Sequence, residues 1–415
     1  MKEWIKECER ALRPLYERLD EIALFNQKKV LDAFRNNKLA LRHFAPSTGY
    51  GYGDEGRDVL NRIMADIFRA EAAVLSPNIV SGTHALALGL YAILRPGDVF
   101  LSITGTPYDT LIDVIDGKGN GSLKDFGISF ETIPLKNGGF DFEAIEAYLA
   151  FRQPKMIYLQ RSRGYEWRSA LNISQIGQAV RRIRKTGYTG CIMLDNCYGE
   201  FVEEQEPLEA GVDIVAGSMI KNPGAGIAPT GGYLAGKKEY IELVQNRMTA
   251  PSIGGEVGSY AFTYQYYYEG LFLAPHVVKE ALKGSLLFGK VFSKIGYDTS
   301  PAPDEIPGDI IRAIRFGDRE KLIGFIQTVQ AVSPVDSYVD VLPWAMPGYE
   351  SEVIMAAGCF VQGSSIELSA DAPVKEPFIA YLQGGLTYEH CKIALESILE
   401  RFEKRCKNHQ ERFSL

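Results

Sequence analysis

Apolar residues recur with different periods along this chain of 415 residues, and each period predicts a type of secondary structure. Over residues 1–40, apolar side chains such as Trp4, Leu12 and Leu19 recur near a 3.6-residue period, which predicts a helix. The same period predicts helices over residues 55–68, 84–94, 108–115, 142–150 and 174–186. Short apolar runs between them predict strands over residues 73–80, 99–103, 128–133, 156–160, 191–194, 214–216 and 232–235.

Predicted strands and helices alternate through the middle of the chain. This order is typical of an α/β fold, and it predicts a mainly parallel sheet of seven strands covered by helices on both faces. Ligands bind such sheets beyond the carboxyl ends of the strands. Polar side chains that directly follow these strands are therefore the candidates for function.

A run rich in tyrosine and phenylalanine over 256–272 predicts a buried helix. The pattern changes from about residue 292, where prolines cluster and shorter strand-like segments follow at 310–316 and 359–366. Residues 389–404 predict a terminal amphipathic helix. We expect three parts: an N-terminal helix and active-site loop segment (1–60), a large cofactor-binding domain (61–290) and a small C-terminal α+β domain (291–415).

Composition limits the classes of partner. The net charge of −7 and the pI near 5.5 offer no basic face for a nucleic acid. No secretory signal pattern and no apolar run of membrane-spanning length occurs, so we expect a cytoplasmic protein with no membrane partner. The six cysteines make no CxxC pair and the five histidines are dispersed, so we expect neither structural disulfides nor a metal site.

Lys221 is the residue with the most informative surroundings. It follows a mostly apolar run and precedes the turn Asn222-Pro223-Gly224, while Asp195 closes another apolar run. A strand-end lysine opposite a strand-end carboxylate suits a covalent aldehyde cofactor. The amine forms a Schiff base and the carboxylate keeps a pyridinium nitrogen protonated. Alone, the lysine could be a surface charge and the aspartate a helix cap or magnesium ligand. Together they predict bound pyridoxal 5'-phosphate (PLP).

Three further segments fit that cofactor. Ser81, Gly82 and Thr83 follow a strand and open a helix, where free backbone N–H groups favour a phosphate. Ser218 precedes Lys221 by three residues and could face the same phosphate, and Tyr108 could stack on a flat ring. An ordinary capped helix and helix-start packing remain the alternatives for the first segment and for Tyr108.

The order of these motifs resembles the fold-type-I PLP enzymes, whose fold is aspartate aminotransferase-like. Within them, the chain resembles the cystathionine/methionine lyases, and most of all the branch called methionine γ-lyase-like or aluminium resistance proteins. The resemblance spans nearly the whole chain. The motifs that carry it are STGYGYGD at 47–54 with GR at 56–57, SGTHA at 81–85, GTPYDTL at 105–111, QRSRGY at 160–165, IKNPG at 220–224 and YLQGGL at 381–386.

The resemblance implies roles for individual residues. Lys221 would bind the cofactor aldehyde and take the substrate α-proton, and Asp195 would pair with the ring nitrogen. Tyr108 would stack on the ring and is a candidate proton donor. Gly82, Thr83 and Ser218 would hold the phosphate. Tyr52 and Arg57 would reach the phosphate of a neighbouring subunit, which implies a homodimer or homotetramer. The expected substrate is a small sulfur-containing amino acid, cleaved by β- or γ-elimination as in a cystathionine β-lyase or methionine γ-lyase.

One part of the family pattern is missing. These lyases usually carry a C-terminal arginine for the substrate carboxylate, and this sequence offers instead Lys375, Arg163 and Arg312 as candidates. A PLP-dependent aminotransferase, racemase or other amino-acid transformation stays open as an alternative, because the same first carbanion serves all these reactions and motifs near the ring cannot separate them. A nucleotide-binding protein or NTPase is a third reading, but the lysine precedes the glycines of 222–226 and the GxxxxGK[ST] order is absent.

Overall fold

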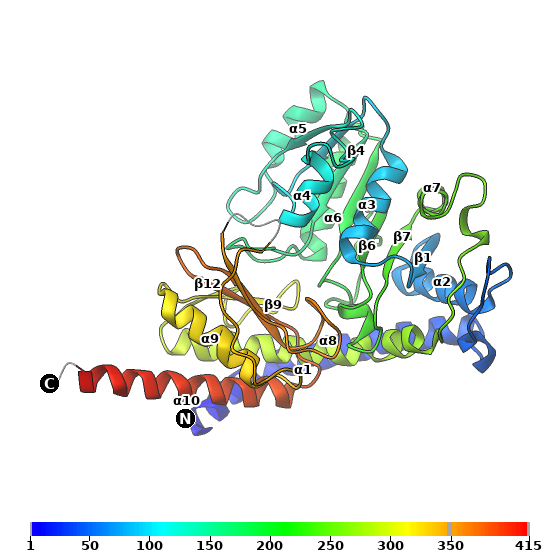
Figure 1. Cartoon of the computed structure of the whole chain (residues 1–415). Helices are drawn as coiled ribbons and strands as arrows, with labels where there is room; N and C mark the ends of the chain where they lie inside the picture. Colours follow the sequence, from blue (N-terminus) through cyan, green and yellow to red (C-terminus); the bar gives the residue numbers. More distant parts are fainter. Residues whose placement is uncertain (1, 347–350, 413–415) are drawn as a thin grey trace.

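The structure is a computed structural model that describes residues 2–346 and 351–412, with side chains as far as Arg401. It holds two sheets with helices packed around them (Figure 1). The strands are β1 (Ala72–Ser76), β2 (Val99–Ser102), β3 (Ser129–Thr132), β4 (Met156–Gln160), β5 (Cys191–Asp195), β6 (Ile214–Ser218), β7 (Gly232–Gly236), β8 (Asp298–Ser300), β9 (Ile311–Arg315), β10 (Val353–Ala356), β11 (Ser369–Pro373) and β12 (Ile379–Gln383). The α-helices are α1 (Lys2–Asn36), α2 (Glu55–Phe68), α3 (Gly82–Ile93), α4 (Asp109–Asp116), α5 (Phe142–Phe151), α6 (Ile173–Lys185), α7 (Lys238–Met248), α8 (Gln265–Lys294), α9 (Arg319–Ala331) and α10 (Tyr388–Arg412). Short 3₁₀ helices are η1 (Leu41–Phe44), η2 (Asn222–Gly224) and η3 (Gly254–Glu256).

The large sheet has the seven strands that the sequence predicts, in the order β1-β7-β6-β5-β4-β2-β3. It is mixed rather than purely parallel. Strands β6, β5, β4, β2 and β3 run parallel, whereas β7 is antiparallel to both β6 and β1. The reason lies in the connection from β6 to β7, which carries only the short η2. Without a helical crossover the chain returns in the opposite direction.

Helices cover both faces of this sheet because successive strand residues point to opposite sides. On one face Met193 and Ala216 pack against apolar residues of α3, α4 and α7. On the other face Leu194 and Val215 join the larger core, which includes α1, α2, α5, α6 and α8. Figure 1 shows α1 and α8 lying side by side beneath both sheets. The sheet is thereby fixed from both sides and its strand ends hold a constant position.

The small sheet has the order β10-β11-β12-β9-β8, and all its pairings are antiparallel. The strand predicted at 310–316 is confirmed as β9. The strand predicted at 359–366 is wrong. Its amides at Phe360 and Val361 donate to the Glu367 carboxylate instead of to a neighbouring strand. Gly363, at φ 105°, then turns the chain out of an extended path.

The helix predicted at 256–272 begins later than expected, at Gln265. The preceding segment is bound to the loop after α1 instead: the Gly258 amide donates to Tyr50 O, and the Tyr264 amide to Phe44 O. The predicted domain boundaries at residues 60 and 290 stay predictions, and residue 290 lies inside α8.

Within the described part of the chain, none of the helices has the length and apolar character needed to cross a membrane. The cysteines whose side chains are described are free and buried, and Cys406 lies outside the described side chains. The same described residues contain no group of three His, Cys, Asp or Glu side chains arranged to hold a metal ion.

Candidate active site

The carboxyl ends of β4, β5 and β6 meet at one edge of the large sheet. Gln160 pairs with Asp195, and Asp195 pairs with Ala216, so the ends of the three strands are in register. Lys221 follows the end of β6 by three residues and directly precedes η2. The sequence-predicted lysine and aspartate are therefore brought to the same edge by parallel pairing.

Asp195 is 5% exposed, and its Oδ1 accepts the amide hydrogen of Cys197 at 3.0 Å. Burial raises the pKa of this carboxyl group, while the Cys197 amide and the charge of Lys221 hold it down. The amide and the side chain of Cys197 both hydrogen-bond this carboxylate. A buried carboxylate also needs a positive charge beside it to stay ionised, and a cationic nitrogen placed against Asp195 would supply that charge.

Lys221 lies against an aromatic ring that the sequence analysis did not identify. Its Nζ lies 3.6 Å from the ring centroid of Tyr198, close enough for a cation–π contact. Burial lowers the pKa of Lys221, but Cys197, Tyr198 and Asp195 raise it, and the net direction is upward. The chain without cofactor therefore holds Lys221 protonated at neutral pH.

The segment Ser81–Thr83 forms a cradle at the start of α3. The Ser81 Oγ accepts the His84 amide at 3.0 Å, as expected for a helix N-cap. The amides of Gly82 and Thr83 have no recorded acceptor among the described residues, since the first N–H groups of a helix have no partner within it. A Cβ at Gly82 would lie 3.3 Å from Ser218 Cβ and 3.4 Å from Cys197 Sγ. The predicted phosphate residues thus lie together, with space that only glycine leaves open.

Tyr108 joins this cradle to the rest of the site. Its hydroxyl lies 3.0 Å from Thr83 Oγ1, and its amide donates to Gln160 Oε1 at 3.0 Å. Burial raises the pKa of Tyr108, and the charge of Asp195 raises it further. The tyrosine is therefore neutral at physiological pH and retains its proton.

Tyr52 and Arg57 are not joined to this group by the contacts of the single chain. Tyr52 is 69% exposed and packs on Tyr50, with ring centroids 5.9 Å apart. The Arg57 guanidinium is buried and donates to Gly51 O at 3.0 Å and to Asp58 Oδ1 at 2.9 Å. Their predicted contact with a neighbouring subunit stays a prediction.

The tertiary structure adds two acids, Asp371 and the buried Glu200, to the surroundings of Lys221. Asp371 belongs to β11 of the small sheet, and burial raises its pKa to about 7 although Tyr165 and Lys221 lower it. Glu200 is fully buried, and burial raises its pKa to about 8. Nothing in the local sequence of Asp371 indicates this position, because a fold contact between the two sheets creates it. Glu200 and Tyr198 directly follow β5, so the strand-end rule could have found them.

Glu200 predicts a measurable pH dependence of stability. Its folded pKa near 8 lies above the unfolded value of 4.5, so the folded chain binds this proton more tightly. The contribution of Glu200 to the free energy of unfolding is therefore fully present below about pH 4.5 and is lost as the pH rises through 8. Glu200→Gln should raise the free energy of unfolding at pH 8.5 by on the order of 2–4 kcal/mol, with little change at pH 5. Urea denaturation at both pH values measures this.

The exposed Glu239 offers a matched control, since Glu239→Gln removes an equal charge from the surface. That variant should follow the wild-type pH profile. Equal slopes for Glu200→Gln and wild type would contradict a buried, proton-binding Glu200.

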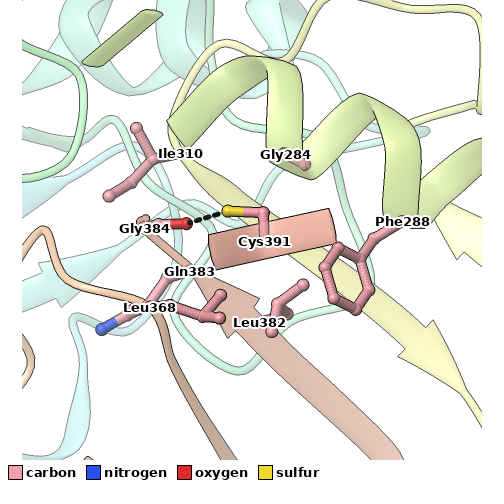
Figure 2. A pocket seen from close by; sticks show the side chains of 9 residues that line it. Gly284, Phe288, Ile310, Leu368, Leu382, Gln383, Gly384 and Cys391 are labelled. Atoms are coloured by element: carbon pink, nitrogen blue, oxygen red, sulfur yellow. Dashed lines mark hydrogen bonds between the residues drawn. The ribbon is translucent and has the colours of Figure 1, made fainter. Parts of the chain in front are cut away.

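A pocket in the core lies away from these groups. It is formed by α8, β12 and the start of α10, and Figure 2 shows its lining of mainly apolar side chains with the Cys391 thiol directed at Gly384 O, 3.8 Å away. Its lining carries no charged side chain. A gap of this kind suits core packing and does not suit a charged amino acid or a phosphate.

Comparison with known proteins decides the family. The family model described as methionine gamma-lyase matches residues 1–403. The chain belongs to the methionine γ-lyase family. This result confirms the resemblance inferred from the motifs.

Relatives with high identity cover the whole length of this methionine γ-lyase family member. The uncharacterized protein YnbB of Bacillus subtilis (strain 168) is 46% identical over 404 residues, which covers 96% of each chain. A solved structure from Listeria monocytogenes, described as a candidate cystathionine beta-lyase involved in aluminum resistance, is 47% identical with a TM-score of 0.94 and covers 97% of this chain and 100% of that one. A carbon-sulfur lyase involved in aluminum resistance from Clostridium novyi is 46% identical with a TM-score of 0.91, covering 96% and 95%.

More distant structures share the fold of this methionine γ-lyase family member. The pyridoxal-5'-phosphate dependent protein YhfS of Escherichia coli is 18% identical with a TM-score of 0.61, covering 92% of this chain and 97% of that one. At this identity the likeness shows the fold alone. It places the chain among α/β proteins with a large mixed sheet.

Proposed function

We propose that this chain is a PLP-dependent carbon–sulfur lyase acting on a small sulfur-containing amino acid. The observation that carries the proposal is the meeting of Lys221, Asp195 and the open N-terminus of α3 at one sheet edge. An amine, a buried carboxylate and an anion cradle are the three groups that an aldehyde, a pyridine nitrogen and a phosphate require. Membership of the methionine γ-lyase family, and the description of a relative as a carbon-sulfur lyase, support the same reaction class.

The residues present fit the cofactor. Lys221 would hold its aldehyde, Asp195 its ring nitrogen, and Gly82, Thr83 and Ser218 its phosphate, with Tyr108 against the ring. When bound, PLP supplies an electron sink for negative charge at the substrate α-carbon. The open amides of Gly82 and Thr83 are the hydrogen-bond donors that a bound phosphate would satisfy.

The chain's own groups account for the proton transfers of an elimination. As a neutral amine, Lys221 would take the α-proton of the substrate. The carboxylate of Asp195 would keep the ring nitrogen of the cofactor protonated, because a buried negative charge favours a positive charge beside it. Tyr108 retains its proton at neutral pH and can donate it to the departing sulfur. With one water consumed, the products are a thiol, ammonia and a 2-oxo acid, so no oxidant or reductant is needed.

A second subunit completes the proposed site. Tyr50 and Tyr52 are exposed on the loop before α2, and Arg57 lies in the first turn of α2, where its guanidinium donates to Gly51 O. We propose that a homodimer or homotetramer places this loop against a neighbouring phosphate cradle.

A substrate panel tests the reaction class. The PLP-loaded protein is incubated separately with cystathionine, methionine, cysteine and common amino acids, and thiol, ammonia and 2-oxo acid are measured. We expect the three products in equal amounts from at least one sulfur-containing amino acid. Amino-group transfer to an added 2-oxo acid without thiol release would instead assign an aminotransferase.

A further inference from the structure

Arg163 is a fully buried cation whose donors are all unused. It is 0% exposed, and its Nε, Nη1 and Nη2 have no hydrogen-bond partner among the described residues. Removing a guanidinium from water without replacing its hydrogen bonds costs several kcal/mol. Burial accordingly lowers the pKa of Arg163. An unpaired charge of this kind is expected where a ligand supplies the missing partner.

Two neighbouring arginines differ from Arg163, because both donate hydrogen bonds to surrounding backbone carbonyls, although Arg312 Nη2 has no partner among the described residues. Arg312, equally buried, donates to the carbonyls of Ser285 and Pro301. Arg168 donates to Ser162 O and to the Glu166 carboxylate. These side chains hold loops together. The sequence offered Lys375, Arg163 and Arg312 as candidates for the carboxylate site. Arg312 is structural and Lys375 is exposed, which leaves Arg163.

The acid that faces Arg163 is already engaged. Asp309 raises the pKa of Arg163 through its charge, but its Oδ2 accepts the Ser162 hydroxyl and its Oδ1 accepts the Ile311 amide. No ion pair within 4.0 Å joins Asp309 to Arg163 among the described residues. The guanidinium thus keeps its hydrogen-bonding capacity for another group.

Position connects Arg163 to Lys221. Arg163 stands three residues beyond the end of β4, on the sheet edge that carries Asp195, and its loop is tied to Tyr108 through Gln160. The charge of Arg163 lowers the pKa of Tyr381. The rings of Tyr381 and Tyr165 pack together with their centroids 5.1 Å apart. The same aromatic group includes Tyr198, on whose ring Lys221 lies. A molecule bound at Lys221 therefore has Arg163 across this tyrosine group.

We propose that Arg163 binds the carboxylate of the amino-acid substrate, an inference that rests on the proposed function. The planar guanidinium offers parallel N–H donors that match a carboxylate, which a lysine cannot do. The site would then differ from the expected C-terminal arginine, because β12 brings Tyr381 rather than an arginine to this place. Substrate recognition comes from the loop after β4, on the large sheet.

The first test measures recognition. PLP-loaded wild type and Arg163→Met are titrated with L-methionine and with L-methioninamide, which lacks the carboxylate, and binding is followed by the visible spectrum. Wild type should bind the acid about 100-fold more tightly than the amide. Arg163→Met should lose that preference, and its affinity for the amide should stay unchanged. The acid-to-amide ratio of Arg163→Lys should lie between those of wild type and Arg163→Met. Arg315→Met, which removes a paired surface arginine of β9, should keep the wild-type ratio.

The second test needs neither cofactor nor substrate. Arg163→Met removes an unpaired buried charge, so the melting temperature of the empty protein should rise by ~2 °C. Arg312→Met should lower it, because bonded carbonyls lose their donor. A fall for Arg163→Met, or an unchanged acid-to-amide ratio, overturns the proposal for Arg163. Failure of wild type to retain PLP would overturn the proposed function instead, and the melting temperature would still decide whether Arg163 is structural.

Discussion

Lys221→Ala should abolish lyase turnover and covalent cofactor attachment while leaving the fold intact. The side chain is the only amine placed at the end of β6, opposite Asp195, in the described site. Loss of a general base alone costs about 10²–10⁴-fold in rate, and the same residue also holds the cofactor. We expect no thiol release above background. After borohydride reduction, mass spectrometry should find PLP on the Lys221 peptide of wild type and on no peptide of the variant.

Two further lysine variants make the result specific. Lys221→Arg keeps a positive charge over the Tyr198 ring but cannot form the Schiff base, so it should be as inactive as the alanine variant. Lys238→Ala removes an exposed lysine that only pairs with Glu242 at 3.7 Å, and it should retain full activity. Reduction that labels a different lysine in the wild type would contradict the assignment of Lys221.

Asp195→Asn should reduce turnover by roughly 10²–10⁴-fold with a much smaller loss of PLP affinity. Breaking a buried ion pair costs about 3–5 kcal/mol, and each 1.36 kcal/mol in a barrier is about tenfold in rate. The amide fills the same space and still accepts the Cys197 amide hydrogen, so the strand end is preserved. Steady-state kinetics and PLP titration by fluorescence separate the two effects.

Asp213 provides the matched control. It is also buried beside β6, but it lies at the opposite strand end and pairs with Arg184 and Lys237. Asp213→Asn should lower the melting temperature and leave kcat nearly unchanged. If Asp195→Asn behaved in that way, with stability lost and turnover kept, Asp195 would be a structural residue.

Much of the fold follows from local patterns. The seven strands of the large sheet and most of its helices have the predicted type. This is because the spacing of apolar residues differs between helices and strands and indicates which side of each element is buried. The direction of β7 does not follow from its residues Gly232–Gly236, since the connection before it sets that direction. The segment 359–366 is apolar enough for a strand, yet the Glu367 carboxylate binds its amides in a loop.

The candidate site divides in the same way. Lys221, Asp195 and the Ser81–Thr83 cradle were predictable because parallel strands end at a common edge, so that position in sequence translates into position in space. Asp371 could not be predicted, because a contact between the two sheets brings it to Lys221. The sequence offered three equal candidates for the carboxylate, and only hydrogen-bond geometry distinguishes the unpaired Arg163 from the bonded Arg312.

The sequence by itself determined the α/β class and the family, and it led to the proposed roles of Lys221, Asp195 and the Ser81–Thr83 cradle. These features lie in short segments, so their order and spacing are visible without knowing which distant segments are in contact. Only the tertiary structure decided the mixed strand directions, the ring beneath Lys221 and the unused donors of Arg163. Those properties depend on which groups are buried together and which remain unpaired, and burial is settled by packing between segments that lie far apart in the chain.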